Sequence, residues 1–232
     1  MSVDRDIGPA ASEAMSMRRV ARRILRRPYS AMRFVLSTLS RVVSRPAAAQ
    51  PAADGRATIS ETSKCRASLA AFCVGDGLDI GFGGDPIVPT AIAMDLPQRY
   101  ARYLEHPQHL HGDAADLHWF RDGTLDYVYS SHVLEDFHDT SGVLTEWLRV
   151  LRPGGRLVLY LPDEQAYRAH CRREGKEPNV HHVHEHFSLA HVKSCLPAIG
   201  MEIEHERFPV GVYSFELVVR KSAAPSTAVG RS

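Results

Sequence analysis

The stretch 77-GLDIGFGGDPIVPTAIAMD-95 contains two short apolar runs, each with an acid at or near its end, and a glycine cluster between them. This pattern is typical of the carboxyl edge of a nucleotide-binding sheet. It differs from a dinucleotide loop because Pro86 stands where GxGxxG would place its third glycine. The acids and glycines are Asp79, Gly81, Gly83, Gly84 and Asp95.

The connection between the two apolar runs is short. Only residues 85–90 separate the glycines from the second run, whereas a parallel crossover helix needs about a dozen residues. Without that helix no N-terminus faces a pyrophosphate, and no GK[ST] follows that would complete a phosphate-binding loop. The stretch therefore disfavours a nicotinamide oxidoreductase and a nucleoside triphosphatase.

The charge of the chain is divided unevenly. The 232 residues are 44% hydrophobic and 24% charged, which is typical of a soluble globular protein. Residues 1–58 carry 11 arginines and four acids, or +7, and the remainder carries 17 basic and 23 acidic residues, or −6. A basic arm thus precedes a mildly acidic domain, and this asymmetry indicates an interaction role for the arm.

The N-terminal arm has an amphipathic pattern in residues 18–43. Paired arginines alternate with apolar residues in 18–27, and an apolar stripe follows in 31–43. A helix of this kind can contact an anionic membrane surface or a partner; a solvated basic arm and a transit peptide are the alternatives. We expect a cytoplasmic protein with peripheral membrane contact through residues 18–43, and no recognition module favours nucleic-acid binding.

The chain divides into three parts. Residues 1–58 are the arm and a Pro/Ala-rich linker, residues 59–221 form the domain, and residues 222–232 are a disordered tail. Four distant cysteines form no CxxC pair and are expected to be free thiols in a reducing compartment.

Strand and helix signals alternate in the domain, which predicts a doubly wound, mostly parallel sheet covered on both faces. Ser60 or Thr62 caps a helix running to about Phe72. The last two strands alternate in polarity like an antiparallel hairpin. The expected strands are 78–81, 91–95, 109–112, 125–130, 156–161, 201–208 and 213–220, and the other expected helices are 142–151 and 189–199.

Four polar side chains stand at or near strand ends, where ligands bind in open α/β sheets: Asp79, Asp95, Asp113 and Ser130. Carboxylates at this edge repel a diphosphate. They suit S-adenosylmethionine, which has no phosphate and presents an ammonium, a sulfonium, ribose hydroxyls and an adenine amino group. Glycines let the backbone approach the amino-acid end of such a ligand.

These residues carry a family resemblance. LDIGFGG, AIAMDL, HGDAADL and LDYVYSSHVLEDF, followed by WLRVLRPGGRLVLYLPD, occur in the order found in class I S-adenosylmethionine-dependent methyltransferases. Residues 77–161 resemble the small-molecule, type 11-like members, and with weaker flanks the resemblance covers about two thirds of the chain. It implies a Rossmann-like seven-stranded sheet with an antiparallel C-terminal strand, and S-adenosyl-L-methionine as cofactor.

The resemblance also implies roles for single residues. Asp95 takes the ribose position, and Asp113 and Ala114 lie beside the adenine. The missing helix after the first strand is a departure, which predicts an irregular, proline-stiffened crossing at DPIVP. The full expected cofactor set is Asp79, Gly81, Gly83, Asp95, Leu96, Asp113, Ala114 and Ser130.

The acceptor would approach the segment SSHVLEDFHD. Its candidate residues are His132, Glu135, Asp136 and His138, of which His132 and Asp136 are the predicted general bases, with a structural cap as the alternative. The motif 181-HHVHEHF-187 predicts a substrate loop with His184 and His186 as contacts. Its alternating histidines match no known zinc spacing, so no metal is expected.

Two functions follow. The first is methyl transfer to a small molecule, a sugar or a lipid-linked acceptor. The alternative is a catalytically inactive protein of the same fold that binds the cofactor or serves as a scaffold.

Overall fold

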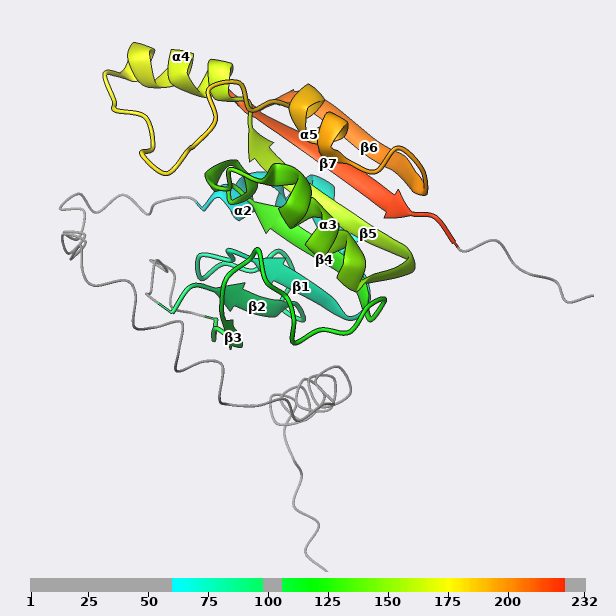
Figure 1. Ribbon diagram of the computed structural model, residues 1–232. Helices are drawn as coiled ribbons and strands as arrows, with labels where there is room; N and C mark the ends of the chain where they lie inside the picture. Colours follow the sequence, from blue (N-terminus) through cyan, green and yellow to red (C-terminus); the bar gives the residue numbers. More distant parts are fainter. Residues whose placement is uncertain (1–59, 98–105, 224–232) are drawn as a thin grey trace, which may run out of the picture.

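The computed structural model describes residues 60–97 and 106–223, which form a seven-stranded sheet in the order β3-β2-β1-β4-β5-β7-β6 (Figure 1). The pairs among β1 to β5 are parallel, and β7 is antiparallel to β5 and β6. The predicted doubly wound architecture is confirmed. The strands are β1 (Gly77–Ile80), β2 (Ile92–Asp95), β3 (Leu110–His111), β4 (Leu125–Ser131), β5 (Leu151–Pro162), β6 (Met201–Val210) and β7 (Ser214–Lys221).

The central strands are buried on both faces, which explains their continuous apolar sequences. β5 is longer than the predicted strand 156–161. It begins five residues earlier, at Leu151, directly after the preceding helix, and ends at Pro162. The Pro153–Gly155 turn therefore lies inside β5, where the register with β4 shifts. Gly155 must be glycine, since a Cβ there would lie about 3 Å from three backbone carbonyl oxygens.

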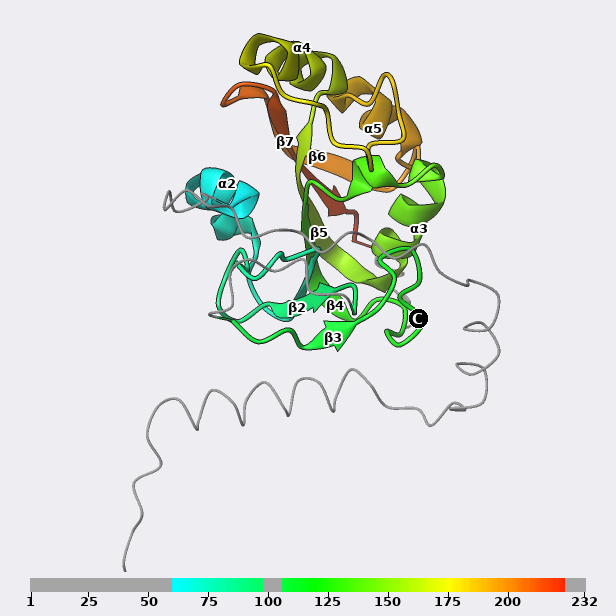
Figure 2. The ribbon, with the colours of Figure 1, turned by 90° about the vertical axis from the view of Figure 1, so that its left-hand side faces the viewer.

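Helices cover the two faces of the sheet unequally. The helical segments are α2 (Glu61–Leu69), η1 (Ala70–Phe72), η2 (Leu134–Asp136), α3 (Thr140–Val150), α4 (Glu164–Glu174) and α5 (Leu189–Cys195). Figure 2 shows α2 on one side of the sheet and α3 and α5 on the other. One apolar core lies under α3 and α5, and a smaller one under α2 includes Leu69, Tyr127 and Tyr129.

The predicted caps and stripes explain most helices. Ser60 caps α2 by accepting from the Ser63 amide at 2.9 Å, as the sequence indicated. Asp139 starts α3 by accepting from the Gly142 amide at 2.8 Å, two residues earlier than expected. α5 ends at Cys195 rather than Ile199, because Pro197 cannot continue the helix.

No helix was predicted from the sequence at α4. Asp163 caps the helix by accepting from the Ala166 amide at 3.0 Å. Gly175 ends it in the left-handed conformation at φ 62°, a frequent helix terminator. Aspartate is a frequent residue at helix starts and glycine at helix ends, so the sequence did mark both ends of α4.

The connection between β1 and β2, residues 81–91, contains turns and no helix. The predicted irregular crossing is confirmed. Asp85 fixes it to α2, since it accepts from the Ser60 hydroxyl and forms an ion pair with Arg66 at 2.5 Å. The crossing also covers the smaller core with Ile87, which is 1% exposed.

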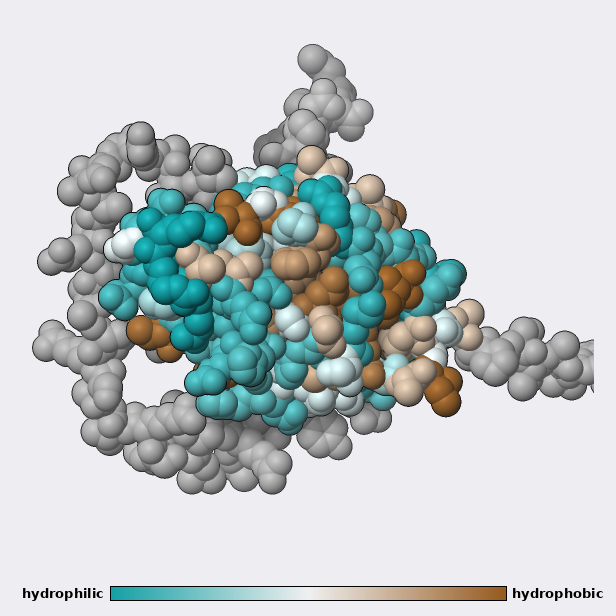
Figure 3. Space-filling view, turned by 90° about the horizontal axis from the view of Figure 1, so that it is seen from above, coloured by the Kyte–Doolittle hydropathy of each residue, from teal (hydrophilic) through white to brown (hydrophobic). Residues whose placement is uncertain are grey.

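Within the described residues, no helix is long and apolar enough to span a membrane. The view from above mixes hydrophilic and apolar side chains on the surface (Figure 3). The amphipathic pattern of residues 18–43 and most of the predicted tail lie outside the described residues.

Candidate active site

The glycine loop after β1 folds back onto β2. The amides of Gly81 and Phe82 both point at the Met94 carbonyl oxygen, at 2.8 and 3.4 Å. Gly81 has φ 69°, and a Cβ on it would lie 2.2 Å from a methyl carbon of Val133. A side chain at this position would therefore fill the space between the loop and the end of β4.

A cavity of about 640 Å³ opens where β1, β2 and β4 end. Eight residues predicted for the site line it: Gly81, Gly83, Asp95, Leu96, Asp113, Ala114, His132 and Asp136. The rest of the lining was not predicted from the sequence; it consists of Ile80, Met94, Gly112, Val133, Phe137, Asn179 and His181. The structure thus brings the glycine loop, two strand-end acids and the SSHVLEDF segment together around one cavity.

Asp79 and Ser130 are not among the lining residues. Asp79 is 1% exposed and accepts from the Ile87 amide at 2.7 Å, so it supports the crossing between β1 and β2. Burial raises the pKa of this carboxyl to about 8. The Ser130 hydroxyl donates to the Ile80 carbonyl at 3.1 Å. Asp79 and Ser130 were predicted to contact the cofactor. In the structure their side chains instead bind backbone groups of neighbouring segments and support the wall of the cavity.

Asp95 orders the glycine loop. Its two carboxylate oxygens accept from the Gly83 amide at 3.1 Å and from the Leu96 amide at 2.8 Å. Carboxylate oxygens have further lone pairs, so the same group can accept from ligand hydroxyls. The third strand end supplies Asp113, which accepts from the Ala115 amide at 2.9 Å.

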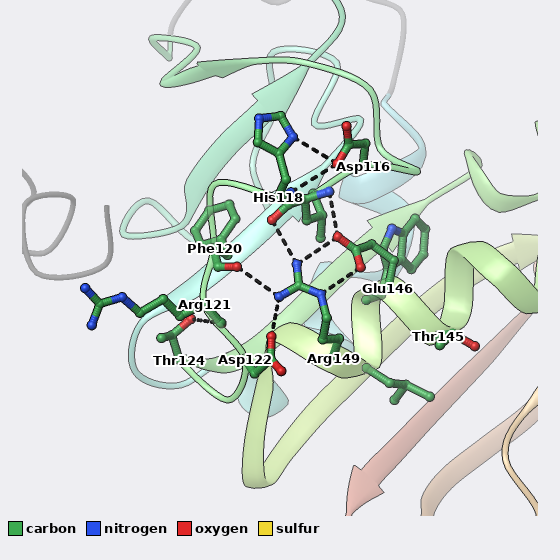
Figure 4. Close-up of polar contacts among 12 residues, drawn as sticks. Asp116, His118, Phe120, Arg121, Asp122, Thr124, Thr145, Glu146 and Arg149 are labelled. Carbon is green, nitrogen blue, oxygen red and sulfur yellow. Dashed lines mark hydrogen bonds and ion pairs between the residues drawn. The ribbon is translucent and has the colours of Figure 1, made fainter. Parts of the chain in front are cut away.

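Residues 112–124, which link β3 to β4 without a helix, are held by α3 (Figure 4). The Arg149 guanidinium donates to the carbonyls of Leu117 and Phe120 at 3.0 and 2.9 Å. It also binds both carboxylate oxygens of Glu146, at 2.7 and 2.8 Å. Trp147 donates to the Ala114 carbonyl at 2.8 Å, so α3 positions a cavity residue directly.

His132 has strained backbone and enclosed ring nitrogens. Its φ of 52° is uncommon outside glycine and occurs often at functional sites. Nε2 lies 3.3 Å from the Ser214 hydroxyl and 3.4 Å from Glu61, and Nδ1 lies 3.5 Å from Glu135. Burial lowers the pKa of His132 to about 4, so the ring is neutral and a weak base at neutral pH.

Asp136 is the acid that η2 contributes to the cavity. It lines the cavity, and its Oδ1 is buried with no hydrogen-bond partner in the described part of the chain. Burial raises the pKa of its carboxyl. Asp136 is therefore a stronger base than an ordinary carboxylate.

The two histidines predicted to contact substrate do not line the cavity. His184 lies with Nε2 2.7 Å from the Phe137 carbonyl oxygen, and His186 is exposed on the surface. Asn179 and His181, from the same segment, line the cavity instead. Across residues 60–97 and 106–223, no three His, Cys, Asp or Glu side chains are grouped to hold a metal ion.

The donor set fits S-adenosylmethionine. Asp95 and Asp113 can accept from hydroxyl and amino groups, and the glycine loop leaves room for close approach. None of the described residues in the lining is a lysine or an arginine, which a phosphate-bearing ligand would call for.

Comparison with known proteins finds a methyltransferase domain in the same part of the chain. The family model described as a methyltransferase domain matches residues 78–159. A curated relative, an uncharacterized 37.1 kDa protein in a transposon of Streptomyces fradiae, is 33% identical over 97 residues. The match covers 38% of this chain and 28% of that protein, so it spans less than a third of the relative's length.

Solved structures share the fold at low identity. An S-adenosylmethionine-dependent methyltransferase of Thermotoga maritima, described as a possible histamine N-methyltransferase, has a TM-score of 0.52 at 18% identity, covering 70% of this chain and 87% of that one. A complex of a Haloferax volcanii methyltransferase activator, Trm112, with a methyltransferase gives 0.51 at 17%, covering 71% and 89%.

The [4+2]-cyclase SpnF also matches, with a TM-score of 0.51 at 17% identity over 74% of this chain and 85% of that one. These likenesses show the fold, and SpnF shows that this fold can host another reaction. The strand order and the domain match over residues 78–159, about a third of the chain, together show a Rossmann-like methyltransferase fold and agree with the resemblance to class I S-adenosylmethionine-dependent methyltransferases.

Proposed function

We propose that the protein transfers the methyl group of S-adenosylmethionine to a small molecule, a sugar or a lipid-linked acceptor. The observation that carries the proposal is the cavity of about 640 Å³, lined by the glycine loop, by Asp95 at the end of β2 and by Asp113 just after β3. This volume is large enough for a cofactor and part of an acceptor.

At the cofactor end, each group has a matching chemistry. The backbone of the loop from Gly81 to Gly83 would meet the amino-acid part of the cofactor. Asp95 would accept from the ribose hydroxyls, and Asp113 with Ala114 would lie beside the adenine. When bound, the cofactor supplies an electrophilic methyl group on a sulfonium.

At the acceptor end, the chain can hold the acceptor and take up its proton. Asp136 is better suited to this than His132, because its Oδ1 has no hydrogen-bond partner among the described residues, whereas burial lowers the pKa of His132 to about 4 and makes its ring a weak base. His132, whose nitrogens face Ser214, Glu61 and Glu135, would shape the wall and remain neutral.

Calorimetric titration with S-adenosylmethionine and S-adenosylhomocysteine tests the cofactor assignment. We expect binding by the wild type and at least tenfold weaker binding by Asp95→Ala, since charge-assisted hydrogen bonds would be lost. Asp116→Ala, at a carboxylate 64% exposed and outside the cavity lining, is the matched control and should bind normally. Absence of binding by the wild type would refute the proposal.

Transfer of a labelled methyl group to polar, carbohydrate and lipid fractions of a cell extract then identifies the acceptor class. Incorporation into one fraction, lost in Asp95→Ala, supports the enzyme. Tight cofactor binding without transfer to any fraction would favour the alternative of an inactive binding or scaffold protein.

A further inference from the structure

The segment 178–187, called the strap here, joins α4 to α5 and passes over the acceptor end of the cavity. Asn179 and His181 line the cavity from the strap. The Asn179 amide donates to the Tyr167 hydroxyl at 3.0 Å, and the Asn179 side-chain oxygen accepts from the His181 amide at 3.1 Å. The strap therefore presents an ordered polar surface to the cavity.

His182 anchors the strap to the body of the domain. Its side chain is 4% exposed, and Nδ1 lies 2.7 Å from Glu164, the first residue of α4. Nε2 lies 3.6 Å from Glu135, whose carbonyl also accepts from the Val183 amide at 3.2 Å. One imidazole thus joins the strap to η2 and to α4.

Apolar packing alone does not explain this cluster. Glu135 and Glu164 are 1% and 0% exposed, and burying such groups is costly unless their partners are well placed. The same Glu135 oxygen that faces His182 lies 3.5 Å from His132 in the cavity wall. The cluster therefore fixes the strap and the cavity wall relative to one another, and His182 is a positioning residue.

The one polar residue that η2 contributes to the cavity lining is an acid. Asp136 is the acid there, and its Oδ1 lacks a hydrogen-bond donor within the described chain. The described lining offers no lysine or arginine to bind an anionic acceptor. The remaining groups, His132, Asn179 and His181, are polar, and Val133 and Phe137 are apolar.

The geometry points to an amine as the acceptor, bound in its ammonium form by Asp136 in the part of the cavity that Asn179 and His181 of the strap also line. The nitrogen would pass one proton to the Asp136 carboxylate, and its freed lone pair would then form the bond to the methyl group as the carbon–sulfur bond of the sulfonium breaks and leaves a thioether. A carboxylate in a partly buried site binds an ammonium through charge-assisted hydrogen bonds and repels a carboxylate or a phosphate. The apolar Phe137, which follows Asp136 in the chain, would contact the carbon skeleton of the amine. This inference rests on the proposed function and narrows its acceptor class.

The test uses three probes of similar size and different charge: benzylamine, benzyl alcohol and benzoate. Each is titrated into the full chain saturated with S-adenosylhomocysteine, and binding is measured by calorimetry. We expect benzylamine to bind about tenfold more tightly than benzyl alcohol, and benzoate not to bind. Asp136→Asn should weaken benzylamine binding about tenfold and leave S-adenosylhomocysteine affinity within about twofold.

Matched variants separate positioning from general damage. His182→Ala should weaken benzylamine binding and accelerate amide exchange in residues 179–183, whereas His186→Ala, at an exposed histidine of the same strap, should change neither. Glu185→Gln, an exposed acid of the strap, is the charge control for Asp136→Asn.

Two failures are distinguishable. If S-adenosylhomocysteine does not bind, the proposed function fails and this inference fails with it. If it binds, the inference alone is overturned by any of three results: benzoate or benzyl alcohol binding as tightly as benzylamine, no binding of any probe, or unchanged benzylamine affinity in Asp136→Asn.

Discussion

Strands β1 to β3 and strands β4 to β7 are connected by different kinds of structure. Residues 81–91 and 112–124, which follow β1 and β3, contain turns and no helix. The chain between β4 and β6, in contrast, carries α3, α4 and α5, and the last two strands form an antiparallel hairpin. The glycine loop, Asp95 and Asp113, which line the cavity, therefore all come from the first half, whose described connections contain no crossover helix.

In the helix-free connections of the first half, side chains take over the hydrogen bonding that a crossover helix would provide for its own backbone. A helix satisfies its own backbone groups, whereas each turn in the first half depends on a named side chain. Asp79 accepts from the Ile87 amide, Asp95 accepts from the Gly83 amide, and Arg149 donates to two carbonyls of the 112–124 connection. We therefore expect single substitutions in this set to destabilise the protein more than comparable changes in the helical half.

Arg149→Met should have the largest effect. It leaves Glu146 and the carbonyls of Leu117 and Phe120 without their donor, at a cost of about 2–4 kcal/mol in the free energy of unfolding. Urea denaturation followed by circular dichroism measures it. Arg172→Met, at an exposed arginine of α4, should cost less than about 0.5 kcal/mol. If the two variants lost the same free energy of unfolding, the helix-free connections would not depend on single side chains more than the helical half does.

Asp79→Asn should change how stability depends on pH. The pKa of Asp79 is about 8 in the folded protein and 3.8 for a freely solvated aspartate, so the folded state binds more protons between these values. The contribution of Asp79 to stability is therefore present at low pH and falls by up to about 1.4 kcal/mol per pH unit as pH rises.

Asparagine does not titrate, so the variant lacks this loss. Urea denaturation of both proteins at pH 5, 6 and 7 should show the stability of Asp79→Asn rising relative to wild type with each step. A difference that stays constant with pH would mean that Asp79 titrates normally.

Trp147→Phe tests whether α3 positions the 112–124 connection where it lines the cavity. Loss of the donor to the Ala114 carbonyl should cost about 1–2 kcal/mol in stability. Because Ala114 lines the cavity, the affinity for S-adenosylhomocysteine should also fall a few-fold in calorimetry. Thr145→Ala, at an exposed position of the same helix, should leave the affinity unchanged. A stability loss with full affinity would show that α3 does not position the site.

Asp85→Asn should have the smallest effect. It removes the charge from the ion pair with Arg66, whose side chain is 37% exposed, at a cost of about 0.5–1 kcal/mol. The amides of residues 81–91 should exchange faster with solvent, because the crossing is held less firmly to α2. Glu174→Gln, at an exposed ion pair of 3.9 Å at the end of α4, is the control that should change neither.

The sequence predicted the sheet well because its signals are local. Apolar runs with a period of two or with burial on both faces identified the strands, and Ser60 marked the start of α2. The short 85–90 connection left no room for a helix, and the structure has none. α4 was missed because its apolar content is low, although Asp163 and Gly175 marked both ends.

The site was predictable only where the chain order fixes proximity. Strand ends of one parallel sheet meet at one edge, which placed Asp95 and Asp113 together. The position of His182 between Glu135 and Glu164 depends on how a loop returns over the sheet. No local pattern encodes that return, so the prediction named His184 and His186 where the structure places Asn179 and His181.

The two outer strands bear on how the protein behaves in concentrated solution. An open strand edge can recruit a neighbouring molecule and seed aggregates. At one edge, β3 is only two residues long and offers few free backbone groups. At the other, β6 has two breaks in its register with β7 and presents polar side chains and a proline, which discourage pairing with a second molecule: Glu202, Glu204, His205, Glu206, Arg207 and Pro209.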